Sequence, residues 1–387
     1  MKMNKLYFFV LLLGTASFIR FVLTPFLNHQ NIFLQLGSVI IILFIGAFFL
    51  LRASAKVIEE TTEILSERTK LAGGLLQSLG TAFPDMVLGI VAAIVSVNLR
   101  ATDYPRAINY AIIAASTTFG SNIYNIGHAA WCMYRQNKAN KSNRSIFMFP
   151  GIPGGGKVIP FTKHLIKPHL LEFDTAIQIL IALTLLTSVV AVSMVLFGKV
   201  QIKELNLTED LYQLIRPIGI VIFFLSGLIL YLFRKTHRKE SAINDIAEAE
   251  QFYRKKSTGT ILFHLLLSGA IILLTAESMI YAIEALSQIT HISPVITGAF
   301  AGLIGCLGEM LVIHNYTVNP KGRIGDALIG VGMDNIVTTA GAAIVAMMGG
   351  IFLGGSSLIV IFVLILGMNT ILIGQVSQMK NYFYRSG

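Results

Sequence analysis

The chain has 387 residues, of which 54% are hydrophobic and only 13% are charged, and its mean hydropathy is +0.71. Because a soluble domain carries about 25% charged residues, this composition excludes a soluble globular protein. The net charge of +10 does not indicate a nucleic-acid partner. The basic residues lie in short segments between apolar runs, where membrane topology explains them.

Apolar runs of about 18 residues or more recur along the chain, which predicts an all-α polytopic membrane protein. We expect about ten transmembrane helices, at roughly 6–27, 34–57, 71–98, 107–133, 174–197, 214–233, 259–288, 292–318, 324–348 and 352–376. The first is either a retained anchor helix or a signal peptide, because lysines precede a short apolar core that small residues follow.

These spans give the expected organisation of the chain. It consists of an N-terminal anchor helix or signal peptide at 1–33, a first membrane half at 34–233, a basic cytoplasmic loop at 234–258 and a second membrane half at 259–387. With ten spans, one side of the membrane receives both termini and 24 of the 30 Lys and Arg residues. The positive-inside rule therefore predicts a multi-pass protein with both termini in the cytoplasm, if the first helix is retained.

One segment between spans contains a glycine cluster. Residues 134–173 include PGIPGGGKVIP, which resembles a phosphate-binding loop only in having glycines before a lysine. The spacing and the Ser or Thr that such a loop requires after the lysine are missing. We therefore expect a plain, turn-rich linker.

An apolar segment with one acid occurs twice. GGLLQSLGTAFPDM at Gly73–Met86 superposes without a gap on TGAFAGLIGCLGEM at Thr297–Met310, with a shift of 224 residues. The superposition places Asp85 on Glu309. Because a lone acid inside a membrane span costs roughly 3 kcal/mol, two acids at matching places predict a paired ion site.

The first copy of the segment also contains residues that break a helix. Gly80, Thr81 and Pro84 interrupt the span, since proline removes a helix hydrogen bond and glycine lets the backbone unwind. Such a break is tolerated inside a membrane where the backbone lines a cavity. Thr81 and Asp85 are four residues apart, so a hydroxyl and a carboxylate share one helix face.

The span after the first copy carries FGSNIYNIG, in which Ser121 and Asn125 are again four residues apart. These two side chains could present neutral oxygens toward Asp85, although Ser and Asn also commonly join membrane helices by hydrogen bonds. In the second copy, Gly308 can loosen the helix before Glu309.

The span after the second copy reads GVGMDNIVTTAG. Its candidate oxygens are paired at helical spacing, Asp334 with Thr338 and Asn335 with Thr339. The spacing leaves open which pair faces Glu309. Two buried carboxylates with neutral oxygens suit a hard cation, so we expect Asp85 and Glu309 to hold Ca²⁺ or Na⁺. Two negative charges balance one Ca²⁺, two Na⁺ or two protons, and an empty pair of ionised acids would be very unfavourable in low dielectric.

At these residues the sequence resembles the calcium/cation antiporter superfamily, nearest its sodium/calcium exchanger branch. Members carry two α-repeats of opposite membrane orientation, each with a GTSLPE-like and a GSNIFN-like stretch. Here the first repeat, at 71–133, reads GTAFPD and GSNIYN, and the second, at 292–348, reads IGCLGE and GVGMDN. The resemblance implies two inverted-topology repeats and a secondary active transporter, not an enzyme, whose partners are inorganic cations and the bilayer.

The resemblance also implies a set of cation ligands. The first-repeat ligands would be Thr81, Asp85, Ser121 and Asn125, and the second-repeat ligands would be Glu309 and Asn335, with Asp334 in reserve. Several sodium ligands of the family are replaced, because Ala82 stands for a serine and Gly305 and Cys306 stand for a threonine and a serine.

Na⁺/Ca²⁺ exchange by alternating access at Asp85 and Glu309 is the main functional hypothesis, with the transported Ca²⁺ and Na⁺ or H⁺ as ligands and no cofactor. The alternatives are an antiporter coupled to H⁺ or selective for another cation, and a family member that binds an ion without transporting it. An intramembrane aspartyl protease fits poorly, because GRIGD at Gly322–Asp326 lacks the spacing of the GxGD motif and a protease leaves the repeat unexplained.

Overall fold

A computed structural model describes residues 5–69, 80–165, 168–200, 210–234, 250–319 and 324–386 of the chain. The first two spans are α1 (Lys5–Phe18), which continues through η1 (Ile19–Leu23) and η2 (Thr24–Asn28), and α2 (Ile32–Ile45), which continues through η3 (Gly46–Leu51) into α3 (Arg52–Thr69). The following long helices are α5 (Phe83–Leu99), α6 (Tyr104–Ser142), α7 (Leu170–Phe197), α8 (Arg216–Arg234), α10 (Thr258–Thr290), α11 (Pro294–Val318), α12 (Ile324–Met348) and α13 (Gly355–Ser386).

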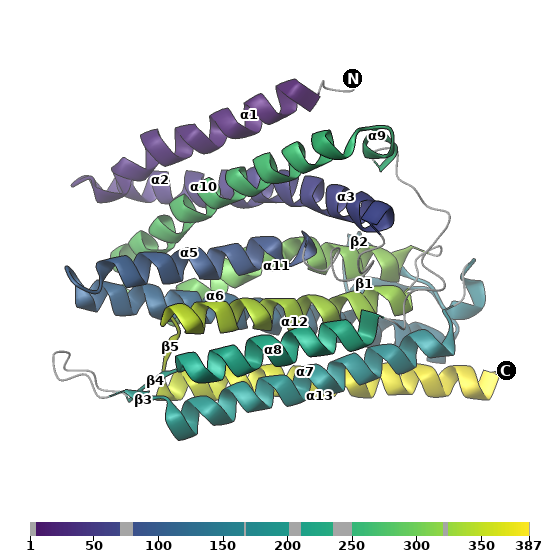
Figure 1. Ribbon diagram of the computed structural model, residues 1–387. Helices are drawn as coiled ribbons and strands as arrows, with labels where there is room; N and C mark the ends of the chain where they lie inside the picture. Colours follow the sequence, from purple (N-terminus) through teal and green to yellow (C-terminus); the bar gives the residue numbers. More distant parts are fainter. Residues whose placement is uncertain are drawn as a thin grey trace.

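These helices lie alongside one another in a single bundle (Figure 1). Eight of the described helical segments are long and apolar enough to cross a membrane, and α5 is a shorter apolar helix of 17 residues. Many large apolar side chains face outward, as Phe33 and Leu266 do with 82% and 73% of their surface exposed. An apolar exterior of this extent is expected of a surface in contact with lipid. The expected all-α, multi-pass fold is confirmed.

Both chain ends lie at the same end of the bundle (Figure 1). The short helix α9 (Glu250–Arg254) and the antiparallel strands β1 (Ile146–Phe149) and β2 (Ile152–Val158) lie at that end too. The opposite end carries a three-stranded sheet of β3 (Lys199–Val200), β4 (Leu211–Gln213) and β5 (Phe352–Gly354). Within the described residues, the hairpin at 146–158 and α9 therefore place parts of two basic segments at one end of the bundle.

The structure corrects the expectation of a plain linker at 134–173. Helix α6 extends to Ser142, well beyond the expected end of its span, and the glycine cluster forms strand β2 of a hairpin. Gly151 provides the turn with a positive φ of 78°, a conformation that glycine adopts without strain. Part of the expected basic loop at 234–258, residues 235–249, lies outside the described residues.

Buried polar side chains concentrate on two helices near the middle of the bundle. On α6 they include Ser116, Thr117, Thr118, Ser121, Asn122 and Asn125, and on α12 they are Asp334, Asn335, Thr338 and Thr339. Helix α6 packs against α5, α11, α12 and α13. A polar centre inside an apolar bundle is the feature that positions the candidate site.

Candidate cation site

The first repeat contains the helix break that the sequence predicts. The chain is helical at Gly80 and Thr81, bends at Ala82 and begins α5 at Phe83, with Pro84 in the first turn. Proline is tolerated there because the first N–H groups of a helix have no partner within the helix. Asp85 follows in the same turn and is only 1% exposed, so its carboxylate lies at the positive end of the α5 dipole. Residues 73–79 of the motif lie outside the described residues.

The second repeat does not contain the corresponding break. Helix α11 is continuous from Pro294 to Val318, so Gly308 does not interrupt it. Glycine alone lowers helix stability by only about 1 kcal/mol and keeps its N–H, whereas proline removes a hydrogen bond. Glu309 therefore projects from an unbroken helix, with 4% of its surface exposed.

Helices α6 and α11 meet at small residues. A Cβ atom placed on Gly302 would lie 2.4 Å from the carbonyl oxygen of Thr117, and one on Gly120 would lie 2.9 Å from the Cα of Ala299. The Thr117 hydroxyl donates to the carbonyl oxygen of Gly298 at 3.1 Å. Small residues let membrane helices approach to backbone contact. This approach brings the polar side chains of the first repeat against the acid of the second.

Asn125 and Glu309 join the two repeats directly. The Asn125 side-chain amide donates a hydrogen bond to Oε2 of Glu309. The other oxygens of the two side chains, Oδ1 of Asn125 and Oε1 of Glu309, are buried and have no hydrogen-bond partner among the described residues. The helical spacing predicts Asn125 beside Asp85, and the structure instead places its amide on Glu309.

Asp85 lies against Gly305 of α11. A Cβ on Gly305 would lie 1.8 Å from Oδ1 of Asp85, so the carboxylate occupies the space that any larger residue would need. Both oxygens of Asp85 are buried without a hydrogen-bond partner in the part of the chain that the structure describes. The Ser121 hydroxyl lies beside this carboxylate and donates to the carbonyl oxygen of Thr118 at 3.0 Å.

Asp334 brings a third carboxylate to the same region. The Thr81 hydroxyl donates to its Oδ1 at 2.8 Å, which links the broken segment before α5 to α12. Asp334 is near enough to Asp85 and Glu309 to interact electrostatically with both. Asn335 is buried as well, but its amide donates to the carbonyl oxygen of Val331 on its own helix at 2.6 Å.

The remaining polar side chains of α12 bond to their own helix. Thr338 donates to the carbonyl oxygen of Asp334 at 3.0 Å and Thr339 to that of Asn335 at 2.8 Å. Cys306, one turn before Glu309, is fully buried and lies near both Asp85 and Glu309. Its Sγ approaches the carbonyl oxygen of Leu303 at 3.5 Å.

The site therefore contains several buried carboxylate and amide oxygens, on Asp85, Glu309 and Asn125, that have no hydrogen-bond donor among the described residues. An unpaired buried polar group costs about 1–3 kcal/mol, and an ionised one costs more. Carboxylate and amide oxygens in such a position suit a hard cation, which would supply the missing positive charge. The residues that the sequence singles out in both repeats thus lie close together between α5, α6, α11 and α12.

Comparisons of the sequence find no relative: a scan against models of known protein families matches none, and a search of curated protein sequences finds no match. Solved structures do match. The H⁺/Ca²⁺ exchanger CAX matches with a TM-score of 0.56 at 13% identity, over 97% of this chain and 96% of that chain. YfkE matches with a TM-score of 0.55 at 13% identity, over 97% of each chain. The sodium-calcium exchanger NCX_Mj gives a TM-score of 0.47 at 14% identity, over 91% of this chain and 98% of that chain.

The chain has the same fold as the H⁺/Ca²⁺ exchanger CAX and YfkE. This confirms the fold that the two motif-bearing repeats imply, and the likeness is to exchangers, not to enzymes.

Two further acids of the membrane helices lie outside both sequence motifs. Glu277 and Glu284 lie in α10, where Arg20 approaches Glu277 at 2.6 Å and Arg106 approaches Glu284 at 2.9 Å. Both ion pairs line a cavity of about 710 Å³ between the first span, α5, α6 and α10. The signal was present, because two acids seven residues apart on an apolar span share a face and require cations from neighbouring spans. The Tyr110 hydroxyl also donates to the Glu284 carboxylate, at 3.3 Å.

Proposed function

We propose that the chain is a secondary active antiporter that exchanges Ca²⁺ for Na⁺ by alternating access at a site between Asp85 and Glu309. One observation carries the proposal: acids from two duplicated segments lie near each other, buried, with three carboxylate oxygens that have no donor among the described residues. A bound Ca²⁺ requires six to eight oxygens at about 2.3–2.6 Å, and these carboxylates supply its charge balance.

Neutral oxygens would complete the shell around the ion. The Asn125 amide donates to Glu309 in this structure, and when Ca²⁺ binds, its Oδ1 turns toward the ion while Glu309 releases the amide. Ser121 contributes its hydroxyl next to Asp85, and Thr81 orients Asp334 from across the site. Amide and hydroxyl oxygens of this kind are ordinary calcium ligands.

Exchange follows from the charge of the site. With no cation bound, ionised Asp85 and Glu309 would face each other in low dielectric, which is strongly unfavourable. The loaded states are neutralised and can change the side to which the site opens, whereas the empty ionised state cannot. Each ion therefore crosses only when it displaces the other from the same carboxylates.

Protons are a second candidate counter-ion, and one observation favours them. The second repeat has no hydroxyl at Gly305, because the Asp85 carboxylate occupies that space. Fewer neutral oxygens are then left to build separate Na⁺ sites, while three neighbouring acids offer three places for protons. One of the solved structures that share this fold is an H⁺/Ca²⁺ exchanger.

Uptake of radioactive Ca²⁺ into proteoliposomes tests the proposal. Vesicles loaded with Na⁺, vesicles with an outward proton gradient and vesicles with neither are compared for wild type, Asp85→Asn and Glu309→Gln. Asp210→Asn is the matched control, because it makes the same chemical change at an exposed acid that pairs with Lys199.

Na⁺-driven uptake that both site variants abolish and the control retains would support Na⁺/Ca²⁺ exchange. Uptake driven only by the proton gradient would select the second candidate. Absence of uptake under either gradient, with folded protein, would refute calcium exchange and favour a chain that binds ions without transporting them. Unchanged uptake in Asp85→Asn would refute the site.

We also infer that both termini face the cytoplasm. Both lie at the end of the bundle that also carries α9 and the β1–β2 hairpin, which belong to basic segments of the sequence (Figure 1). A C-terminal fusion of green fluorescent protein, which is fluorescent in the bacterial cytoplasm and dark when exported in unfolded form, should therefore fluoresce. A dark fusion would reverse the orientation.

A further inference from the structure

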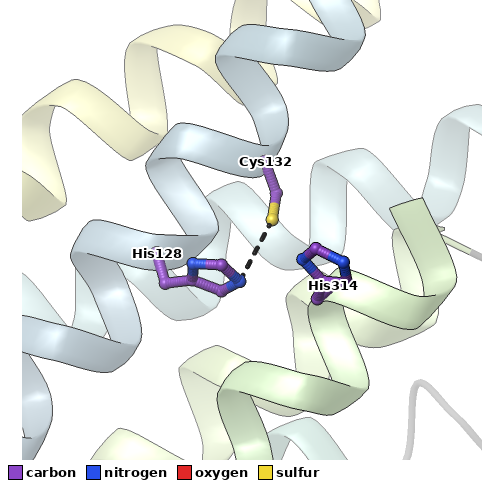
Figure 2. A group of neighbouring side chains, drawn as sticks. All are labelled: His128, Cys132 and His314. Atoms are coloured by element: carbon purple, nitrogen blue, oxygen red, sulfur yellow. Dashed lines mark hydrogen bonds between the residues drawn. The ribbon is translucent and has the colours of Figure 1, made fainter. Parts of the chain in front are cut away.

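Three soft or borderline metal ligands meet where α6 passes α11. His128 and Cys132 lie four residues apart on one face of α6, and His314 faces them from α11 (Figure 2). One ligand atom of each lies within 4.8 Å of the other two. The Nε2 of His128 is 3.6 Å from the Sγ of Cys132, which is fully buried. No carboxylate belongs to this described group, so its chemistry differs from that of the acids around Asp85.

The spacing of these atoms is close to that of a tetrahedral metal site. Zn–S and Zn–N bonds of about 2.3 and 2.1 Å place the two ligand atoms about 3.6 Å apart, as His128 and Cys132 are. The His128 and His314 rings are nearly parallel, with centroids 5.7 Å apart and an interplanar angle of 15°. The ligand atom of His314 lies within 4.8 Å of the other two, so an approach of at most about 1.4 Å brings it to the ligand separation of a shared tetrahedral ion.

An aromatic wall covers the cluster. Phe149 of β1 stacks on the His314 ring with centroids 5.7 Å apart and lies 6.4 Å from that of His128. Trp131 lies parallel to Phe149 at 6.5 Å. The β1–β2 hairpin, which the sequence analysis treated as a linker, therefore closes the site from the side. An apolar cover limits access of water and strengthens the bonds between a metal ion and its ligands.

We propose that His128, Cys132 and His314 bind a borderline divalent transition-metal ion of the Zn²⁺ class, with water as the fourth ligand. Thiolate and imidazole select such ions over Ca²⁺, Na⁺ and Mg²⁺, which require oxygen ligands. The ion connects α6 to α11 about one helical turn beyond Asn125 and Glu309. This site is separate from the acids and does not depend on the exchange activity.

Cobalt spectroscopy on purified, tag-free protein tests the proposal, because Co²⁺ replaces Zn²⁺ and is coloured. The chain has only two cysteines, Cys132 and Cys306, both buried as free thiols. A thiolate-to-cobalt charge-transfer band must therefore come from one of them. We expect this band, together with the intense visible bands of a tetrahedral site, in wild type and in Cys306→Ser but not in Cys132→Ser.

Competition with Zn²⁺ gives the affinity. Changes to groups that only support a metal ligand cost about 10- to 100-fold in affinity, so His314→Gln, which removes a ligand, should cost at least about 100-fold. His264→Gln is the matched control, because His264 lies away from the cluster, against Phe9 and Tyr253. It should bind the metal as wild type does.

Three results would overturn the proposal. The first is a wild-type protein that shows no thiolate band, as expected if the rings and the thiol only pack together. The second is a band that persists in Cys132→Ser and disappears in Cys306→Ser, which would move the metal to the acids. The third is an equal affinity in His314→Gln and wild type. The thiolate-to-cobalt band is measured first on wild type alone, so its absence would count against the proposal whether or not the variants fold.

Discussion

Gly305→Ala tests whether the absence of a side chain at position 305 makes room for the Asp85 carboxylate. The added Cβ would lie 1.8 Å from Oδ1, 3.0 Å from Cγ and 3.2 Å from Cα of Asp85. Oδ1 must retreat by about 1.6 Å to reach an ordinary contact of 3.4 Å. Rotation of the side chain relieves the contacts with Oδ1 and Cγ, but the contact with Cα involves backbone and requires α5 and α11 to part slightly.

The magnitude follows from these distances. Overpacking costs about 1–3 kcal/mol, and replacing glycine by alanine in a helix returns about 0.5–1 kcal/mol. The protein should therefore remain folded. A carboxylate oxygen displaced by about 1.6 Å leaves the coordination shell of Ca²⁺, whose bonds are only about 2.3–2.6 Å long. A loss of about 1.4–3 kcal/mol in binding corresponds to roughly 10- to 100-fold weaker Ca²⁺ affinity.

The assay is the Ca²⁺ concentration dependence of uptake into proteoliposomes, together with thermal unfolding in detergent. Gly308→Ala is the matched control on the same helix, because a Cβ at that position meets nothing within 4 Å. We expect a strongly raised half-saturating Ca²⁺ concentration for Gly305→Ala and a wild-type value for Gly308→Ala. Equal values for the two alanine variants would refute the argument that Gly305 makes room for Asp85.

Three other changes follow from contacts in the structure. Asn125→Leu removes the donor to Glu309 and a calcium oxygen, so Ca²⁺ affinity should fall by about 10- to 100-fold, and an unchanged half-saturating concentration for uptake would contradict this role. Arg106→Leu leaves buried Glu284 without its cation and should destabilise the protein by about 2–3 kcal/mol, less than a fully buried pair because Arg106 is partly exposed. Thermal unfolding measures this, and adding Glu284→Leu should restore the transition. Zn²⁺ should slow Ca²⁺ uptake by wild type but not by Cys132→Ser, and equal inhibition of both would place the inhibitory ion elsewhere.

Local patterns in the sequence were sufficient to predict the spans and the first-repeat break. Pro84 acts on its own helix, so its effect could be predicted from the residue itself, and the structure bends at Ala82 as expected. The equivalence of Asp85 and Glu309 came from the duplicated segment, and the structure places both acids in one buried region. Each of these predictions needed only the sequence of one helix or the comparison of the two repeats.

Contacts between distant helices could not be predicted in the same way. Thr81 donates to Asp334, 253 residues away, and Asn125 to Glu309, 184 residues away. Spacing four residues apart placed Thr81 with Asp85 and Asn125 with Ser121 on one helix face, but it carried no information about the neighbouring helix. The pairing of Arg106 with Glu284 could not be predicted for the same reason. Taken alone, Arg106 indicates only the end of a membrane span and Glu284 only a buried charge.

The two repeats differ at matching positions because their side chains share one space. Thr81 corresponds to Gly305 under the shift that superposes Asp85 on Glu309. If both positions carried threonine, the one at 305 would overlap the Asp85 carboxylate, whereas the hydroxyl of Thr81 is used by Asp334. Loss of the side chain at 305 therefore lets Asp85 approach α11, and Asp334 adds a third acid that the hydroxyl orients. A site in which an additional carboxylate stands in place of a neutral ligand has one more group that can bind a proton. The comparison of Na⁺-driven with proton-driven Ca²⁺ uptake tests that consequence directly.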